Sequence, residues 1–336
     1  MKAHGKKAIT IVTGCLGSGK TTLLQHILKE PSINNNTAVI VNEYGKIGLD
    51  HHLLRQAEER TILLKGGCIC CNSRADLEEE LKELLYADES GESPFERVVI
   101  ETTGMADPSP ILFTILTNPL LQHRYIVDCV ITTVDAKNGM LQLQNNPEII
   151  KQITVADKII LTKTDICSPE EHDAILTHIQ SLNPSCVIIP AVHGKVDPFI
   201  IQEASNVDLL KVIHSLPSPV THPNSNVSSI SFSFSQPLDW TAFGLWLSML
   251  LHANGEKVMR VKGMLDVGEE GPVVLNGVQH IIHPPQHLKQ WPSHNRESYL
   301  IFIVRDIDTA LIERSLKTFQ QFLHTIVNTC ELSTIY

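Results

Sequence analysis

Apolar and polar residues follow a repeating order along the first two thirds of the chain, in which a short apolar run is followed by an amphipathic stretch. Short apolar runs bounded by turn residues predict buried strands, and the spacing between them is typical of helices. We expect strands at residues 9–13, 38–42, 61–64, 98–101, 126–134, 158–161 and 187–190. We expect helices at 20–29, 75–86, 110–117, 148–156, 169–182 and 207–216. This alternation predicts an α/β fold with a doubly wound, mainly parallel sheet.

The pattern changes between Leu216 and Asn226, where three prolines stand among polar residues. Such a stretch predicts a linker. Beyond it we expect strands at 229–235, 257–266, 272–283 and 299–305, and helices at 239–252 and 310–323. Grouped strands with two helices predict a smaller C-terminal α+β domain. We therefore expect a first domain at 1–216, a linker at 217–226 and a second domain at 227–336.

Composition and charge limit the classes of partner. The chain is 43% hydrophobic and has a formal net charge of −10, so neither nucleic acid nor an anionic membrane is expected as a partner. Its apolar runs fall far short of the roughly 20 residues that span a bilayer, and its first residues do not form a signal peptide pattern. Eight irregularly spaced cysteines indicate a reducing, cytoplasmic setting and not a disulfide framework.

The segment GCLGSGKTT, Gly14 to Thr22, matches the phosphate-loop pattern G-x-x-x-x-G-K-[ST] between an expected strand and an expected helix. Glycines let successive backbone N–H groups face phosphate oxygens at a helix N-terminus. Lys20 can reach the β- and γ-phosphates, and the Thr21 hydroxyl can ligate Mg²⁺. We expect a nucleoside triphosphate to contact Gly14, Gly17, Ser18, Gly19, Lys20, Thr21 and Thr22.

Three further positions complete the expected nucleotide site. The segment TKTD follows the strand at 158–161, where the Asp165 carboxylate can accept two donors of a guanine edge and the Lys163 stem can lie across the base. This favours GTP over ATP. Glu101 ends the strand at 98–101 and can hold Mg²⁺ through water. Glu43, after another strand, could orient the attacking water or ligate a metal.

The segment GGCICC places Cys68, Cys70 and Cys71 in one glycine-rich turn. Adjacent cysteines form a disulfide only with strain, whereas thiolates are soft ligands that suit zinc, copper(I), cobalt or nickel. Three of them could bind a single ion and leave one position open for exchange. A redox switch and buried structural thiols are the competing interpretations.

Five motifs in this order, GCLGSGKTTLL, VNEYGKIGLD, GGCICC, ETTGMADPSPI and LTKTD, together resemble the CobW-type P-loop GTPases. In the second domain, WTAFGLWLSMLL and KVMRVKGML are similar to the smaller C-terminal domain of that family. The resemblance implies a P-loop NTPase fold and a metallochaperone that couples GTP binding and hydrolysis to metal transfer. It implies that Cys68, Cys70 and Cys71 form the transition-metal site and makes Glu43 a further ligand or switch residue.

The sequence also departs from the family pattern. Lys46 stands where relatives commonly carry a second glutamate, Thr162 stands where guanine sites often carry asparagine, and the loop lacks a histidine-rich insertion. Zinc is the metal we expect, and the partners are GTP or GDP, the metal ion and a client metalloprotein; a homodimer is compatible with the sequence. The alternative function is a metal- or redox-sensing regulatory GTPase that delivers no cargo. His280, His283, His287 and His294 are either a second metal or docking site or ordinary loop residues.

Overall fold

The computed structural model describes residues 5–41, 61–63, 74–202, 226–292, 296–322 and 327–328. The chain divides into two compact units, one formed by Met1–Leu176 with Cys186–Leu209 and the other by Thr177–Ser185 with Leu210–Tyr336. The predicted linker, apart from its last residue, and the predicted helix at 207–216 lie outside the described residues.

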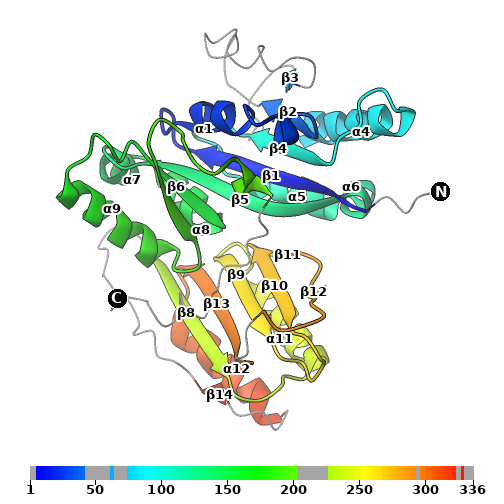
Figure 1. The fold of residues 1–336 in the computed structure, drawn as a ribbon. Helices are drawn as coiled ribbons and strands as arrows, with labels where there is room; N and C mark the ends of the chain where they lie inside the picture. Colours follow the sequence, from blue (N-terminus) through cyan, green and yellow to red (C-terminus); the bar gives the residue numbers. More distant parts are fainter. Residues whose placement is uncertain are drawn as a thin grey trace. The chain divides into compact units, whose positions relative to one another are not determined.

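The first unit is built on a parallel sheet that has seven strands among the described residues (Figure 1), in the order β3-β2-β4-β1-β5-β6-β7. The strands are β1 (Lys7–Gly14), β2 (Thr37–Val41), β3 (Thr61–Leu63), β4 (Arg97–Glu101), β5 (Tyr125–Asp135), β6 (Lys158–Thr162) and β7 (Val187–Ala191). All seven were predicted. For β2, β4 and β6 the reason is that a strand buried on both faces is a nearly continuous apolar run.

Helices cover both faces of this sheet. They are α1 (Lys20–Ile27), α2 (Pro31–Asn34), α4 (Arg74–Ser90), α5 (Ser109–Thr117), α6 (Pro119–Arg124), α7 (Gly139–Asn145), α8 (Pro147–Val155), α9 (Pro169–Leu182) and the 3₁₀ helix η1 (Pro198–Ile201). Ile131 of β5 packs in the cluster that contains α1, whereas the next residue, Thr132, donates its hydroxyl to the backbone of α8. Consecutive strand residues face opposite sides, so α1 and α8 lie on opposite faces and the sheet is doubly wound.

Short helices were the elements that the sequence pattern missed. The helices α2, α6 and α7 have four, six and seven residues, too few for a helical period to be visible. The helix α6 shows what specifies such a piece, because Pro119 occupies its first turn and the Asn118 side chain accepts the N–H groups of Leu120 and Leu121.

The second unit has an antiparallel sheet in the order β11-β10-β9-β13-β8-β14, with β12 paired to β10. Its elements are β8 (Val227–Phe234), α11 (Trp240–Asn254), β9 (Val258–Leu265), β10 (Val273–Val278), β11 (Ile281–Ile282), β12 (Gln286–His287), β13 (Ser298–Arg305), α12 (Thr309–Phe322) and β14 (Val327–Asn328). The predicted α+β organisation is confirmed.

The single strand predicted at 272–283 is wrong. The chain reverses inside it, so that β10 and β11 form a hairpin in which Val278 pairs with Ile281. Gln279 has a left-handed backbone with φ 54° and makes the reversal possible. Glutamine gives no turn signal in a sequence, since glycine or asparagine is the usual residue at such a position.

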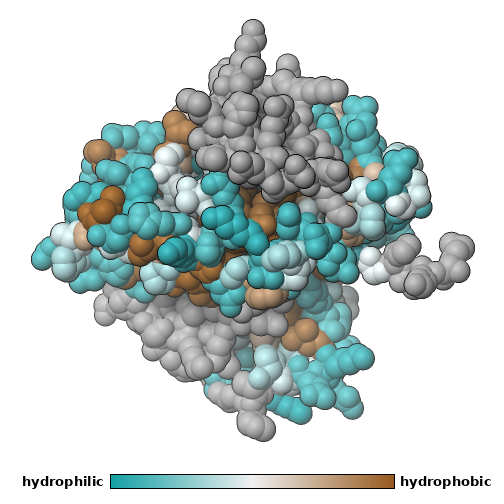
Figure 2. All heavy atoms as spheres, turned by 45° about the horizontal axis from the view of Figure 1, so that its top comes forward, coloured by the Kyte–Doolittle hydropathy of each residue, from teal (hydrophilic) through white to brown (hydrophobic). Residues whose placement is uncertain are grey.

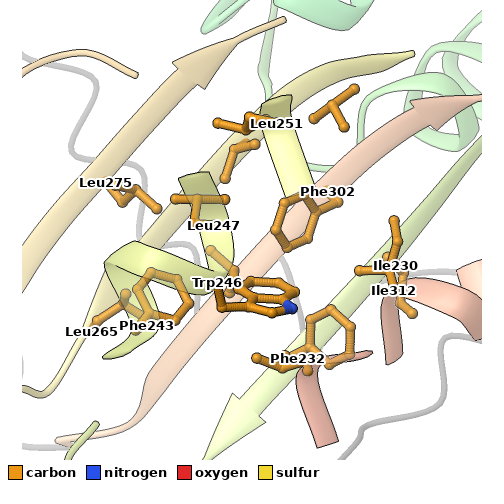
Figure 3. Close-up of a cluster of buried hydrophobic side chains, with 14 of the residues drawn as sticks. Ile230, Phe232, Phe243, Trp246, Leu247, Leu251, Leu265, Leu275, Phe302 and Ile312 are labelled. Carbon is orange, nitrogen blue, oxygen red and sulfur yellow. The ribbon is translucent and has the colours of Figure 1, made fainter. Parts of the chain in front are cut away.

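A single apolar cluster holds the second unit together (Figure 3). Trp246 of α11 lies at its centre, 5.7 Å between ring centroids from Phe243 and 5.9 Å from Phe302 of β13 in an edge-on arrangement. Its indole N–H donates to the hydroxyl of Ser315 on α12. The aromatic ring thus joins both helices to the sheet, and its one polar atom is satisfied.

On the face shown in Figure 2 hydrophilic residues predominate and hydrophobic ones form small separate patches. None of the helices in the described ranges has the length and apolar content needed to cross a membrane.

Replacing the central tryptophan should destabilise the fold strongly. We expect Trp246→Ala to lower the free energy of unfolding by about 3–5 kcal/mol, because it leaves a cavity among packed rings. Leu245→Ala, on the same helix at a side chain 59% exposed, should change it by less than about 0.5 kcal/mol. Urea unfolding followed by circular dichroism measures both, and equal losses in the two variants would contradict this packing.

Candidate functional site

The segment after β1 curls into a tight loop at the carboxyl edge of the first sheet. Gly14, Gly17 and Gly19 have φ values of 139°, 75° and 95°, which side-chain-bearing residues rarely adopt. At Gly14 there is also no room for a side chain, because a Cβ would lie 2.3 Å from the Thr133 hydroxyl of β5. Gly19 is the N-cap of α1, so the loop leads directly into a helix N-terminus, where anions are favoured.

Polar side chains fix the loop from inside. Lys20, whose side chain is buried, donates its Nζ to the carbonyls of Gly14 at 2.9 Å and Cys15 at 3.1 Å. The Ser18 hydroxyl donates to the Cys15 carbonyl at 2.7 Å and lies 2.6 Å from the Thr133 hydroxyl. The ammonium group therefore lies across the mouth of the loop, where an arriving phosphate would meet it.

Cys15 belongs to this loop as a backbone acceptor. Burial raises the pKa of its thiol more than the Leu16 backbone N–H and the Lys20 charge lower it. A thiol held neutral in this way is a poor metal ligand. Cys15 is therefore best described as a packing residue of the loop and not as a metal ligand.

Thr21 and Glu101 form a hydrogen bond beside the phosphate loop. The Thr21 hydroxyl, in the first turn of α1, donates to Glu101 Oε1 at 2.8 Å, and Glu101 ends β4 with only 5% of its surface exposed. A hydroxyl and a carboxylate side by side are hard oxygen donors of the kind that Mg²⁺ accepts. The two residues thus fit a magnesium ion beside the phosphate loop. Thr22 faces solvent on α1.

The segment after β4 runs close to the phosphate loop. Thr102 donates its hydroxyl to that of Thr13 at 2.8 Å, which ties the start of this segment to β1. Gly104 lies so near the loop that a Cβ would be 2.4 Å from the backbone nitrogen of Leu16. A glycine is required here for a close approach of two backbones, and any larger residue would push the two loops apart.

The segment that the sequence predicts to recognise the base follows β6. Lys163, with φ 58°, forms an ion pair of 2.7 Å with Asp135, which ends the neighbouring strand β5. The Asp135 carboxylate also accepts the backbone N–H groups of Lys137 and Asn138. Burial alone would raise the pKa of Asp135, but the hydrogen bonds from Lys163 and Asn138 outweigh it and hold this pKa below its ordinary value. The Lys163–Asp135 pair therefore stabilises the fold at pH values above the ordinary pKa of a carboxyl group. This contribution is lost as the pH falls through the lowered pKa of Asp135.

Thr162 connects base recognition to the phosphate loop. It is buried, and its hydroxyl lies 2.7 Å from the Ser18 carbonyl and 3.1 Å from the Val134 carbonyl, both of which it can reach as a donor. The side chain that we compared with a base-contacting asparagine is thus bonded to backbone in the described structure. It fixes the distance between the two halves of the site.

The turn after β7 lies next to Asp165 and to α1, and the sequence analysis did not predict a role for it in the site. His193 Nε2 lies 3.9 Å from the Asp165 carboxylate, and a Cβ on Gly194 would be 2.9 Å from the Thr22 carbonyl of α1. The available signal was the HGK turn directly behind a predicted strand. Asp135 was missed as well, although its position at the end of a buried strand is where α/β proteins place site residues.

Four predicted residues lie outside the described structure. These are Glu43, Cys68, Cys70 and Cys71. The described strands nevertheless locate the points where the chain leaves for these residues, because Val41 of β2 pairs with Glu101 of β4 and Leu63 of β3 pairs with Val41. Both segments thus depart from the same sheet edge as the magnesium-side carboxylate.

The second unit holds no comparable cluster. Within the described ranges, no three His, Cys, Asp or Glu side chains lie close enough to hold a metal ion. His280 lies in the hairpin turn between β10 and β11, His283 is buried, and His287 packs edge-on against Trp240 at 6.3 Å. His280 lines a cavity of about 500 Å³ together with His252 of α11. His294 lies outside the described residues.

The doubly wound parallel sheet, the glycine loop around Lys20 and the Thr21–Glu101 pair define a P-loop nucleotide-binding protein. Residues 8–190 match the family described as CobW/HypB/UreG, nucleotide-binding domain, and residues 227–320 match the cobalamin synthesis protein cobW C-terminal domain. The chain belongs to the CobW family, as its resemblance to that family indicated.

Named relatives cover the chain almost from end to end. The zinc chaperone YjiA of Escherichia coli is 33% identical over 88% of this chain and 93% of its own length. The zinc chaperone CobW of Pseudomonas aeruginosa is 27% identical over 95% and 92%. The crystal structure of Zn(II)-bound YjiA GTPase from E. coli superimposes with a TM-score of 0.72 at 28% identity, covering 94% of this chain and 99% of that one.

Removing the Asp135 carboxylate charge should weaken nucleotide binding. We expect Asp135→Asn to raise the Kd for GDP about tenfold, because a charge-assisted bond that positions Lys163 is lost. Glu171→Gln, which removes the exposed ion pair to Lys137, should change it less than twofold. Calorimetric titration with GDP measures both, and wild-type affinity in Asp135→Asn would contradict the assigned role.

Proposed function

We propose that this protein is a GTP-hydrolysing metallochaperone that binds zinc through Cys68, Cys70 and Cys71 and delivers it to a client metalloprotein. The observation that carries the proposal is the strand register at one sheet edge. Val41, Leu63 and Glu101 are paired across three adjacent strands. The segments that bear Glu43 and the cysteines therefore begin beside the carboxylate that faces the nucleotide's magnesium side.

The nucleotide half of the proposal assigns a role to each part of the loop. Backbone N–H groups between Gly14 and Thr22 receive the phosphates, and Lys20 exchanges its two carbonyl partners for the β- and γ-phosphates. Thr21 and Glu101 hold Mg²⁺, which when bound neutralises charge that develops on the phosphates. Asp165 accepts the guanine edge while Lys163, held by Asp135, lies along the base.

The hydrolytic step needs a group that orients water at the γ-phosphate. We assign this role to Glu43, which follows β2 two residues after Val41. Attack by water on the γ-phosphorus breaks its bond to the β–γ bridging oxygen and yields GDP and inorganic phosphate. Support for GTP hydrolysis and zinc transfer comes from the relatives, which include YjiA GTPase, a zinc-regulated GTPase metalloprotein activator and zinc chaperones.

The metal half of the proposal follows from ligand chemistry. Three thiolates leave one position of a tetrahedral zinc ion for Glu43, water or a ligand of the client, which suits an ion that must be passed on. Lys46 stands three residues after Glu43 in the sequence, and its positive charge should loosen zinc binding. The segments that bear the cysteines and Glu43 begin at the same sheet edge as Glu101. Hydrolysis of GTP would therefore release a constraint on both segments and change the affinity for zinc. Such a thiol loop works in a reducing compartment, which the cytoplasm provides.

Zinc affinity measured in the two nucleotide states tests the proposal. Anaerobic competition against a chromophoric chelator would compare protein that holds GDP with protein that holds Mg²⁺ and a non-hydrolysable GTP analogue. We expect the two zinc affinities to differ at least fivefold, the lower end of usual coupling, and binding to be lost in the triple variant Cys68/Cys70/Cys71→Ser.

A matched control separates the loop from other thiols. Cys167→Ser removes a described free cysteine from another part of the chain and should bind zinc as the wild type does. If the triple variant retains zinc, the loop is not the metal site. If zinc binds at the loop without regard to the nucleotide while oxidation of the loop changes GTP hydrolysis, the protein is a redox-sensing GTPase.

A further inference from the structure

A buried glutamine on α8 contacts the segment that follows β4. Gln152 is fully buried, and its Nε2 lies 2.9 Å from the Ala106 carbonyl and 3.4 Å from the Gly104 carbonyl. Its own backbone carbonyl accepts the Thr132 hydroxyl of β5 at 2.8 Å. The glutamine thus connects β5 of the first sheet, through α8, to the segment beside the phosphate loop.

A buried amide at this position destabilises the fold relative to an apolar side chain. Its neighbours on the buried side of α8 are Ile149 and Ile153, and Gln152 Oε1 is buried without a hydrogen-bond partner among the described residues. An unsatisfied buried acceptor destabilises the fold, whereas an apolar side chain of the same length would not. Packing alone therefore does not account for a glutamine at this position. We attribute its presence to the hydrogen bonds that its Nε2 donates.

That donor fixes the orientation of peptide groups next to the phosphate loop. Gly104 touches the backbone of Leu16 closely enough to exclude a Cβ, and Thr102 anchors the other end of the segment to Thr13. In a trans peptide the N–H points opposite to the C=O. Holding the Gly104 carbonyl toward α8 therefore sets the direction of the Met105 N–H as well.

We propose that Gln152 is a positioning residue for GTP hydrolysis, which holds the segment from Gly104 to Ala106 so that the backbone N–H groups of Gly104 and Met105 meet the γ-phosphate and the attacking water. The Ala106 N–H has another role, because it donates to the Thr103 carbonyl at 3.1 Å. The inference rests on the proposed GTPase function and adds a residue to it. GDP has no group at this place. Loss of the donor should therefore affect turnover of GTP and leave GDP binding unchanged, which a merely stabilising residue would not do.

Two variants on the same helix test this in the full-length protein. Gln152→Met keeps the length of the side chain and removes the donor, whereas Ile153→Val removes one buried methylene and keeps the donor. We expect Gln152→Met to lower kcat for GTP at least tenfold, since small misplacements of reacting groups have effects of this size. Its KM for GTP and its Kd for GDP should stay within twofold of wild type, and Ile153→Val should show wild-type values of all three.

A third variant examines a half-buried ion pair next to the same segment. Lys151→Met removes the 3.3 Å ion pair with Asp107 and leaves the amide in place, so its kcat should fall less than threefold. The inference is overturned if Gln152→Met hydrolyses GTP with the kcat of the wild type. It is also overturned if both Gln152→Met and Ile153→Val lose kcat and GDP affinity together, because that result would indicate a general loss of stability. If the wild-type protein does not hydrolyse GTP, the proposed function itself is overturned and this inference with it.

Discussion

The contact between Gly14 at the end of β1 and Thr133 on β5 is the constraint on which the site depends. No side chain fits between these two strands at that point, where a Cβ would overlap both the hydroxyl and the carbonyl of Thr133. The chain can therefore turn immediately at the carboxyl edge of the sheet, and Ser18 bonds the returning loop to the same threonine. Gly14 and the Thr133 hydroxyl thus allow the loop after β1 to form an anion-binding site at the carboxyl end of the parallel sheet.

The remaining parts of the site are held by the strands on either side of this point. On one side, Glu101 ends β4 next to Thr21, and Val41 and Leu63 continue the same edge toward the metal-loop segments. On the other side, Asp135 ends β5 and pairs with Lys163, and Thr162 ends β6 and donates its hydroxyl to the Ser18 carbonyl. The phosphate loop thus lies between Glu101 on one side and the Asp135–Lys163 pair on the other.

The elements of this fold could be predicted because their signals are local. Buried parallel strands are short apolar runs, and the phosphate loop is specified by glycines and a lysine within nine residues. The hairpin at Gln279 could not be predicted, because a residue without turn preference adopts the left-handed backbone there. Nor could the partners of the site, since Asp135 lies 28 residues from Lys163, Gln152 lies 46 from Ala106, and Thr133 lies 115 from Ser18. Only the folded sheet brings these side chains together.

The central claim is that this sheet edge binds a guanine nucleotide through Asp165 and the lysine that Asp135 holds. Calorimetric titration of the purified protein with non-hydrolysable analogues of GTP and ATP, each with Mg²⁺, tests it most directly. The account predicts that the GTP analogue binds at least tenfold more tightly, because guanine offers the Asp165 carboxylate two hydrogen-bond donors and adenine lacks that pair. Equal affinities for the two analogues would contradict it.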